Sequence, residues 1–272
     1  MILRMFIHPT AIVDAQVRLN DSLTLGPFCQ IEAGVVLGQN VVVEGHVILK
    51  KGTWLEDDVY VHNFACIGGD PQIKNLNGAF NSGVRIGART IIREGVTIHR
   101  ASEADGITTL GSDCLLMAYS HVGHDCRVGN GCTLANNALL AGCVQVEDFV
   151  FLSGGSMVHQ FVSLGESAFV AGNATITMHV PPFVTVLERN RLKNLNVIGL
   201  RRSGFSTEEV ADVKACYRHV FGHENLSFQR KAQEALQIAL PKTSRGRQFL
   251  EFFVKDKSDR GFVYPLSQSQ AR

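Results

Sequence analysis

A six-residue period is the feature of this sequence that most limits its fold. Every sixth residue is Val, Leu or Ile across 13–67, and the same pattern returns across 86–98 and 110–176. In total 25 positions obey this rule without exception, although hydrophobic residues of every kind make up only 45% of the chain. Chance does not produce such a run, so the period reflects a repeated structural unit.

The period of six fits neither an amphipathic helix nor a plain alternating strand. It predicts a left-handed parallel β-helix, a three-sided prism in which each face of a coil is one hexapeptide. The large aliphatic residue fills the interior, and the residue two places earlier, mostly small or β-branched, lies near the corner. Twenty-five hexapeptides give about eight coils with strands roughly 4.8 Å apart. Cys29, Cys114, Cys126 and Cys132 take the small interior position, so we expect buried free thiols there.

Interruptions of the period predict the domain organisation. Turn-rich and polar insertions are expected at 68–83 and 99–109, where a solenoid usually places its binding loops. The coil pattern ends at Pro181-Pro182. We therefore predict a β-helix domain over 1–183 and a connector with a helical domain over 184–272.

Helix signals appear in the second domain. Ser206 and Glu209 form a capping box before an apolar stripe. A second helix is predicted over 227–240, before Pro241, and a third over 244–254. The last dozen residues are expected to form a frayed tail.

Composition limits the classes of partner and the compartment. The 272 residues carry 26 basic and 25 acidic side chains, so nothing favours a nucleic acid or a membrane as the main partner. There is no run of 18 apolar residues, and the N-terminus does not resemble a secretory signal. Seven cysteines, an odd number, argue against a disulfide framework, so we expect a cytosolic protein.

Charge is divided unevenly between the two predicted domains. Residues 184–272 hold 16 basic and 9 acidic residues, which leaves the β-helix part net negative. A solvated helical cap on the open end of the prism would explain this charge. A basic surface for an acidic partner would explain it equally well, so both interpretations stay open.

The 18-residue coil places candidate catalytic residues in columns. His124 shares a column with Gly142 and Gln160, while His159 stands in the next column. These residues, with His121 and Asp125, are expected to meet on one outer edge of the prism. A histidine can act there as a general base, and a glycine can offer its backbone N–H to an oxyanion.

Two other chemistries are less favoured by the same columns. His121 and His124 have the spacing of zinc ligands on a helix, but on a β-helix they point in different directions. A third ligand would have to come from another subunit, so no metal is expected. Cys143 shares its column with Asp125 and Phe161, and because no base is assigned to it, we do not expect a covalent intermediate.

Six sequence blocks resemble the acyl-carrier-protein-dependent UDP-N-acetylglucosamine O-acyltransferases. The blocks are IIREGVTIHR (91–100), HVGHDC (121–126), LANNALLAG (134–142), VHQF (158–161), VPPF (180–183) and GLRR (199–202). The resemblance covers about 6–255, including the helical part. It implies transfer of a 3-hydroxyacyl chain from acyl carrier protein to the 3-hydroxyl of UDP-N-acetylglucosamine, the first step of lipid A synthesis. It also implies a homotrimer with active sites between subunits and no cofactor or metal.

The resemblance assigns roles to individual residues. His124 matches the general base, Asp125 the carboxylate that orients it, and Gly142 the oxyanion donor. Substrate contacts are implied for a larger set: Lys74, His121, His159, Gln160, Asn196 and Arg202. Gly172 matches the position that limits acyl chain length, where glycine leaves room for a longer chain.

This sequence also departs from the family pattern at four places. Ile73 stands where the family has an acid and a leucine before Lys74, and Cys143 stands where the family has histidine. Ile198 replaces an acid, and Ser203 replaces a second arginine. The base and oxyanion positions are unchanged. The departures leave two alternatives open, an N-acyltransferase on an amino-sugar nucleotide and a non-catalytic paralogue that binds sugar nucleotide or carrier protein.

Overall fold

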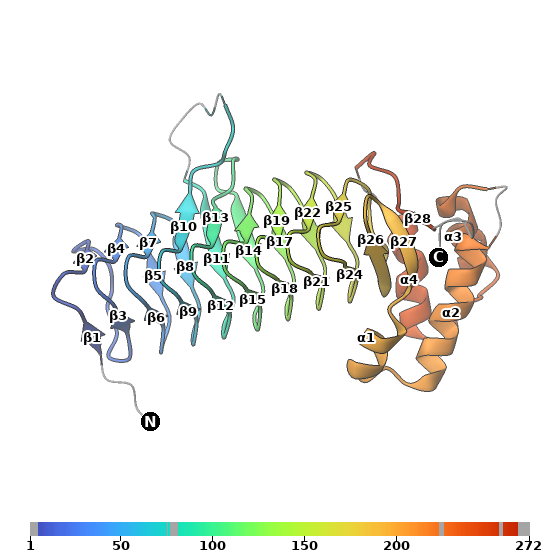
Figure 1. Cartoon of the computed structure of the whole chain (residues 1–272), viewed down its shortest axis with the longest axis horizontal. Coiled ribbons are helices and arrows are strands. Elements are labelled where there is room, and N and C mark those ends of the chain that lie inside the picture. Colours follow the sequence, from blue (N-terminus) through green and yellow to red (C-terminus); the bar gives the residue numbers. More distant parts are fainter. Residues whose placement is uncertain (1–4, 75, 77–80, 223–225, 256–257, 266–272) are drawn as a thin grey trace.

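The molecule is a long prism with a helical part at one end (Figure 1). The computed structural model describes residues 5–74, 76, 81–222, 226–255 and 258–265. Within them, three sheets run along the prism, with 12, 9 and 7 strands, and they are called A, B and C below. None of the described helices is long and apolar enough to cross a membrane.

From β3 to β25, each sheet collects every third strand of the chain. Sheet A holds β1 (Phe6–Ile7), β3 (Thr24–Leu25), β6 (Val42–Val43), β9 (Tyr60–Val61), β12 (Ile91–Ile92), β15 (Leu115–Leu116), β18 (Thr133–Leu134), β21 (Phe151–Leu152), β24 (Phe169–Val170), β26 (Val184–Leu187), β27 (Arg191–Leu195) and β28 (Tyr264–Pro265). Sheet B holds β2 (Ile12–Val13), β4 (Gln30–Ile31), β7 (Ile48–Leu49), β10 (Cys66–Gly69), β13 (Thr97–His99), β16 (His121–Val122), β19 (Leu139–Leu140), β22 (Met157–Val158) and β25 (Thr175–Ile176). Sheet C holds β5 (Val36–Leu37), β8 (Thr53–Leu55), β11 (Gly83–Ile86), β14 (Ile107–Leu110), β17 (Arg127–Val128), β20 (Gln145–Val146) and β23 (Ser163–Leu164). The chain therefore passes from A to B to C and back, which confirms a parallel β-helix.

Strand pairing keeps the 18-residue register that the sequence predicts. Leu134 of β18 pairs in parallel with Leu152 of β21, and Val122 of β16 pairs with Leu140 of β19. All four side chains are fully buried. Stacking these aliphatic residues coil on coil supplies the hydrophobic stabilisation of the prism.

The small interior position also behaves as predicted. Cys29, Cys114, Cys126 and Cys132 are buried, and all seven cysteines are free thiols. Leu19 is an exception among the large positions, because 43% of its surface is exposed. It lies in the first coil, which precedes β5, the first strand of sheet C. No strand of sheet C therefore covers Leu19 on its N-terminal side.

The sheet continues beyond the residue at which the hexapeptide pattern ends. β26 pairs in parallel with β24, β27 returns antiparallel to β26, and β28 pairs with β27. Sheet A therefore continues past residue 183, the predicted end of the β-helix domain. The expectation of a frayed tail is wrong for Tyr264–Pro265, which form β28, and residues 266–272 lie outside the described residues.

Four helices are described after the coils. α1 (Val197–Arg202) was not predicted, whereas α2 (Thr207–Phe221) begins at the predicted capping box and α4 (Ser244–Val254) has the predicted bounds. α3 (Phe228–Gln237) ends three residues before the predicted end. The reason is a left-handed residue, Ala239 (φ 52°), which turns the chain out of the helix.

Neighbouring isoleucines of β12 provide a test of the interior packing. Ile92 is fully buried, whereas Ile91 is 41% exposed on the outer face. Ile92→Ala should lower the free energy of unfolding by about 2–5 kcal/mol, since it opens a cavity between coils. Ile91→Ala should change it by less than about 1 kcal/mol. Urea unfolding of both variants checks this, and an equal loss for both would contradict the interior assignment.

Candidate functional site

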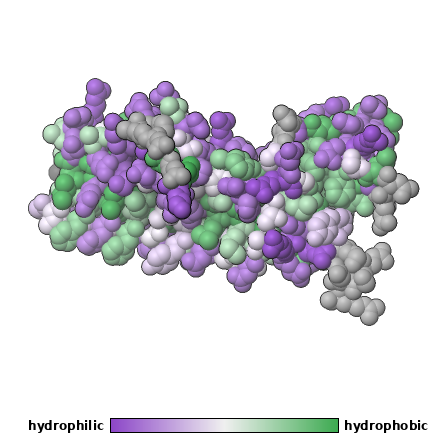
Figure 2. Space-filling view, turned by 90° about the horizontal axis from the view of Figure 1, so that it is seen from above, coloured by the Kyte–Doolittle hydropathy of each residue, from purple (hydrophilic) through white to green (hydrophobic). Residues whose placement is uncertain are grey.

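One edge of the prism carries both insertions and most of the predicted site. We call it the B–C corner, the set of turns in which the chain leaves sheet B and enters sheet C. Turns 123–126, 141–144 and 159–162 stack there, and the two insertions connect β10 to β11 and β13 to β14 at the same corner. The described residues of the first insertion project from this side of the prism (Figure 1), and hydrophilic residues lie along it (Figure 2).

His124 and Asp125 form a hydrogen-bonded pair at this corner. Nδ1 of His124 lies 2.6 Å from Oδ2 of Asp125, and the two side chains are 19% and 20% exposed. Asp125 is left-handed (φ 59°), a conformation that aspartate tolerates in turns. Its backbone N–H donates to Oγ1 of Thr108 over 2.9 Å, which holds the turn against the neighbouring coil.

Ser102, from the second insertion, fixes the Asp125 carboxylate. Its hydroxyl donates to Oδ2 over 2.6 Å, and its backbone N–H lies 3.1 Å from both carboxylate oxygens. Burial acts to raise the pKa of Asp125, but the hydrogen bonds from Ser102 and His124 outweigh it, so this pKa is lowered. Asp125 therefore stays a carboxylate and accepts Nδ1–H, which leaves the lone pair of His124 on Nε2.

Gly142 lies directly against the His124 ring. A Cβ at position 142 would stand 2.5 Å from Cε1 of His124, so only glycine fits beside the imidazole. Its two neighbours in the turn donate hydrogen bonds to adjacent coils. Ala141 N–H donates to the Val158 carbonyl, and Cys143 N–H donates to the His124 carbonyl over 2.8 Å. Within the described residues, no acceptor for the Gly142 N–H is found. The column predicted from the 18-residue period is confirmed for His124 and Gly142.

His121 stands on the outer face of sheet B beside this corner. Its Nδ1 lies 2.8 Å from Oγ1 of Thr97, and its ring meets that of His99 edge-on at 5.0 Å. Burial, followed by the nearby His99 and His124, lowers the pKa of His121 to about 4. His121 is therefore neutral near neutral pH and serves as a hydrogen-bonding group rather than a cation.

Other predicted residues share the corner without contacting the pair. His159 and Gln160 project into solvent one coil beyond Gly142, and Nδ1 of His159 lies 3.5 Å from the backbone oxygen of Gln160. Lys74 is exposed in the first insertion, between β10 and β11. Their positions leave them open to a ligand bound along the corner.

Three predicted residues lie elsewhere on the prism. Gly172 is in the turn from sheet A to sheet B, after β24. Asn196 caps α1 by accepting from Gly199 N–H, and its amide donates to Ser167 in a turn from sheet C to sheet A. Arg202 is the last residue of α1. A single chain therefore does not gather all the predicted site residues at one corner.

Sequence analysis missed the residues that support the pair. Ser102 and Thr108, which hold Asp125, lie within the second insertion. Thr97 and His99, which contact His121, were missed as well; Thr97 precedes this insertion and His99 is its first residue. The signal was present, because an insertion between strands of sheets B and C must leave from the corner that carries His124. It was not used because the path of a loop does not follow from the repeat.

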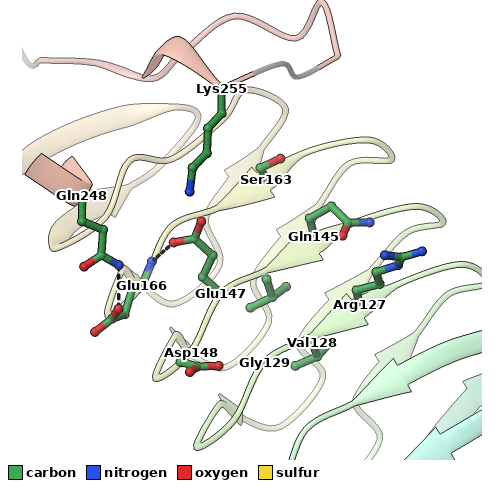
Figure 3. A pocket seen from close by; sticks show the side chains of 11 residues that line it. Arg127, Val128, Gly129, Gln145, Glu147, Asp148, Ser163, Glu166, Gln248 and Lys255 are labelled. Carbon is green, nitrogen blue, oxygen red and sulfur yellow. Dashed lines mark hydrogen bonds between the residues drawn. The ribbon is translucent and has the colours of Figure 1, made fainter. Parts of the chain in front are cut away.

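A cavity of about 620 Å³ lies away from this corner, over the outer face of sheet C (Figure 3). Arg127, Gln145 and Ser163 form its floor, and Gln248 and Lys255 approach from α4 and the residue after it. Two cations and three acidic side chains share the lining. Such a mixture does not indicate one class of ligand, so we place the candidate site by its chemistry and not by the depth of this cavity.

The fold and the repeat define the class of protein. Residues 107–142 match the family model described as bacterial transferase hexapeptide (six repeats). Residues 179–263 match the model described as UDP N-acetylglucosamine O-acyltransferase, domain 2. A hexapeptide-repeat prism with a paired histidine and aspartate on its edge is thus a transferase scaffold.

Relatives then identify the family. The acyl-[acyl-carrier-protein]–UDP-N-acetylglucosamine O-acyltransferase of Janthinobacterium sp. (strain Marseille) is 39% identical over 263 residues, covering 94% of this chain and 98% of that protein. The protein of the same name from Herminiimonas arsenicoxydans is 40% identical, with 94% and 98% covered. The structure of the Francisella novicida UDP-N-acetylglucosamine acyltransferase has a TM-score of 0.89 at 32% identity, covering 97% of this chain and 95% of that one. The chain belongs to this family of acyltransferases, as the sequence blocks predicted.

The lowered pKa of His121 predicts a pH dependence. A folded pKa below the ordinary histidine value of 6.5 means that the folded state resists protonation. Stability should therefore be full above pH 6.5 and fall as the pH drops from 6.5 towards 4. Ring NMR should give a midpoint of about 4 for His121, and His121→Asn should reduce the loss of stability in this interval. A midpoint near 6.5 would contradict the buried environment.

Proposed function

We propose that this chain transfers a 3-hydroxyacyl group from acyl carrier protein to the 3-hydroxyl of UDP-N-acetylglucosamine, the first step of lipid A biosynthesis. The observation that carries the proposal is the His124–Asp125 pair, whose imidazole lies against Gly142, a residue whose N–H has no acceptor among the described residues. Support comes from the relatives reported above, which are named as acyl-carrier-protein-dependent UDP-N-acetylglucosamine O-acyltransferases and align with this chain over nearly their whole length.

In the proposed mechanism, His124 is the general base. Its Nε2 takes the proton of the sugar 3-hydroxyl as the hydroxyl oxygen attacks the thioester carbonyl. The Gly142 N–H donates to the oxyanion that forms, and Asp125 stabilises the imidazolium. The tetrahedral intermediate then expels the carrier thiolate, which takes the proton from His124, so the ester and the free thiol are the products.

No acyl-enzyme is included in this mechanism. Cys143 is the thiol nearest to the pair, but burial, followed by the charges of Asp125 and Glu103, raises its pKa. It is a protonated thiol near neutral pH and hence a poor nucleophile. Direct attack by the sugar hydroxyl needs only the base and the oxyanion donor.

The outer face of sheet B supplies a path for the acyl chain. Leu139 and Met157 follow His121 along that face and are both partly exposed. The column continues to Thr175 of β25, beside the turn that contains Gly172. A Cβ at 172 would lie 3.3 Å from the carbonyl oxygen of Gly154, so the glycine keeps this end open for a longer chain.

The proposed active unit is a homotrimer. His124, Asn196 and Gly172 lie at three different corners of one prism, so a site that uses all three requires neighbouring chains. A threefold arrangement brings different corners together at each interface. The excess of basic residues in 184–272 would then offer an acidic carrier protein a docking surface.

The finer features of the fold belong to the same proposal. Left-handed winding with about eight coils is supported by the hexapeptide repeat. A β-helix domain over 1–183 and a connector with helices over 184–272 remain the proposed division, with sheet A shared across it. Seven free thiols support a reducing, cytosolic compartment.

Replacement of the base tests the proposed mechanism. His124→Ala should lower kcat about 10²–10⁴-fold with acyl carrier protein thioester and UDP-N-acetylglucosamine, because proton removal is lost. His46→Ala, at an exposed histidine in an early coil, is the matched control and should keep the wild-type rate. Near-normal turnover by a folded His124→Ala variant would contradict the assignment.

The same assay separates the alternative acceptor. Ile73, Cys143, Ile198 and Ser203 differ from the family pattern, which motivates a trial of the 3-amino analogue of the sugar nucleotide. The mass of the product distinguishes an ester from an amide. Preference for the amine by a large factor would replace the O-acyltransferase with an N-acyltransferase that uses the same base.

Mixed oligomers test the shared site. His124→Ala and Arg202→Ala chains should each be poorly active alone, because each lacks one side chain of the proposed site. When the two are co-expressed in equal amounts, roughly a quarter of the sites in a trimer combine intact residues from both chains and should recover activity. Mixing the two purified variants without subunit exchange is the control. No recovery in verified mixed trimers would mean that each site lies within one chain.

A further inference from the structure

The turn after Gly142 brings a thiol to the catalytic pair. Cys143 and Asp125 occupy the same position in consecutive turns of the B–C corner, and both are left-handed, with φ values of 62° and 59°. Cys143 N–H donates to the His124 carbonyl over 2.8 Å, which fixes the two turns relative to each other. One ligand atom each from His124, Asp125 and Cys143 lies within 4.8 Å of the other two.

We propose that His124, Asp125 and Cys143 form a Zn²⁺ site that competes with the general-base role of His124. Imidazole nitrogen, carboxylate oxygen and thiolate sulfur are the three ligand types that zinc takes in proteins, at roughly 2.0–2.3 Å. Ligands at those bond lengths stand about 3–4 Å apart in a tetrahedron. Small side-chain rotations bring the observed group to that geometry, and the fourth position is left for water.

Charge also favours a dication here. Binding converts the Cys143 thiol to a thiolate and releases its proton to solvent, so that thiolate and carboxylate together balance Zn²⁺. Glu103 lies close enough to Cys143 to disfavour the thiolate in the absence of a cation. The same negative field that holds the thiol protonated attracts a metal ion.

This ligand set differs from the one weighed in the sequence. That set joined His121 to His124, and it required a third ligand from another subunit. The present set comes from two consecutive turns of one chain, and its third member, Cys143, stands where the family pattern has histidine. The sulfur ligand is therefore particular to this chain.

Whichever nitrogen of the His124 ring binds the metal, the ring can no longer act as a general base. If Nε2 binds zinc, its lone pair is no longer available to take a proton. If Nδ1 binds zinc in place of its contact with Asp125, then the neutral ring carries its proton on Nε2. This inhibitory consequence rests on the proposed function, whereas the binding itself does not.

Direct binding to the full-length metal-free protein tests the site. Calorimetric titration with ZnCl₂ should show one ion per chain, and Co²⁺ should give a thiolate-to-metal charge-transfer absorption. Cys143→Ser and Cys143→Ala should weaken zinc binding roughly 10- to 100-fold or more and abolish that absorption. Cys66→Ser is the matched control, since Cys66 is another half-buried free thiol outside the cluster, and it should leave both readouts unchanged.

The outcomes separate this proposal from the proposed function. No zinc bound by the wild-type protein, or binding that a folded Cys143→Ser variant retains, would overturn the site. Acyl transfer that zinc fails to inhibit, despite bound metal, would overturn its competition with the base. If zinc binds through Cys143 but the metal-free protein transfers no acyl group to any acceptor, the metal site stands and the proposed function fails.

Discussion

Everything at the candidate site depends on hydrogen bonds between consecutive coils that keep residues 18 apart in register. Parallel pairing of β16 with β19 fixes the heights of the turns that follow them. The turns at 123–126 and 141–144 are tied further by the bond from Cys143 N–H to the His124 carbonyl. The proposed base on one coil and the proposed backbone donor on the next are thus positioned by the scaffold itself. Such positioning costs no reorganisation when charge develops on a substrate.

A prism with three corners also gives the reason why the proposed site uses more than one chain. The corner of His124 carries the proposed base, the proposed oxyanion donor and both insertions. Gly172 lies at a second corner, and Asn196, at the start of α1, contacts Ser167 at the third. Residues on different edges of a rigid solenoid cannot converge by a loop movement, because the sheets between them are fully hydrogen-bonded. Convergence requires a neighbouring prism. The oligomer is therefore part of the proposed chemistry and not an addition to it.

The sequence predicted those features that follow its repeat and missed those that do not. The interior positions, the sheet register and the contact of His124 with Gly142 depend only on the repeat, and they were predicted correctly. Ser102 and β28 do not belong to the repeat. Ser102 reaches Asp125 through an insertion whose path depends on tertiary contacts, and Tyr264–Pro265 pairs with β27 from far along the chain. The repeat shows which corner the insertion leaves from, but not which of its residues contacts Asp125, and it carries no information about β28. The support of the carboxylate and the end of sheet A were therefore missed.

Position 143 shows how a rigid column constrains chemistry as well as placement. Its side chain must project beside Asp125, because both residues occupy the same left-handed place in their turns. A residue there cannot avoid the catalytic pair, so its identity alters what the pair can bind. With a thiol at position 143, the site offers a nitrogen, an oxygen and a sulfur ligand, and the nitrogen belongs to the ring that is proposed to take the proton. The same geometry underlies both proposals for His124, as a base and as a ligand, and under them the cation that occupies its lone pair, a proton or a metal, decides which role it takes.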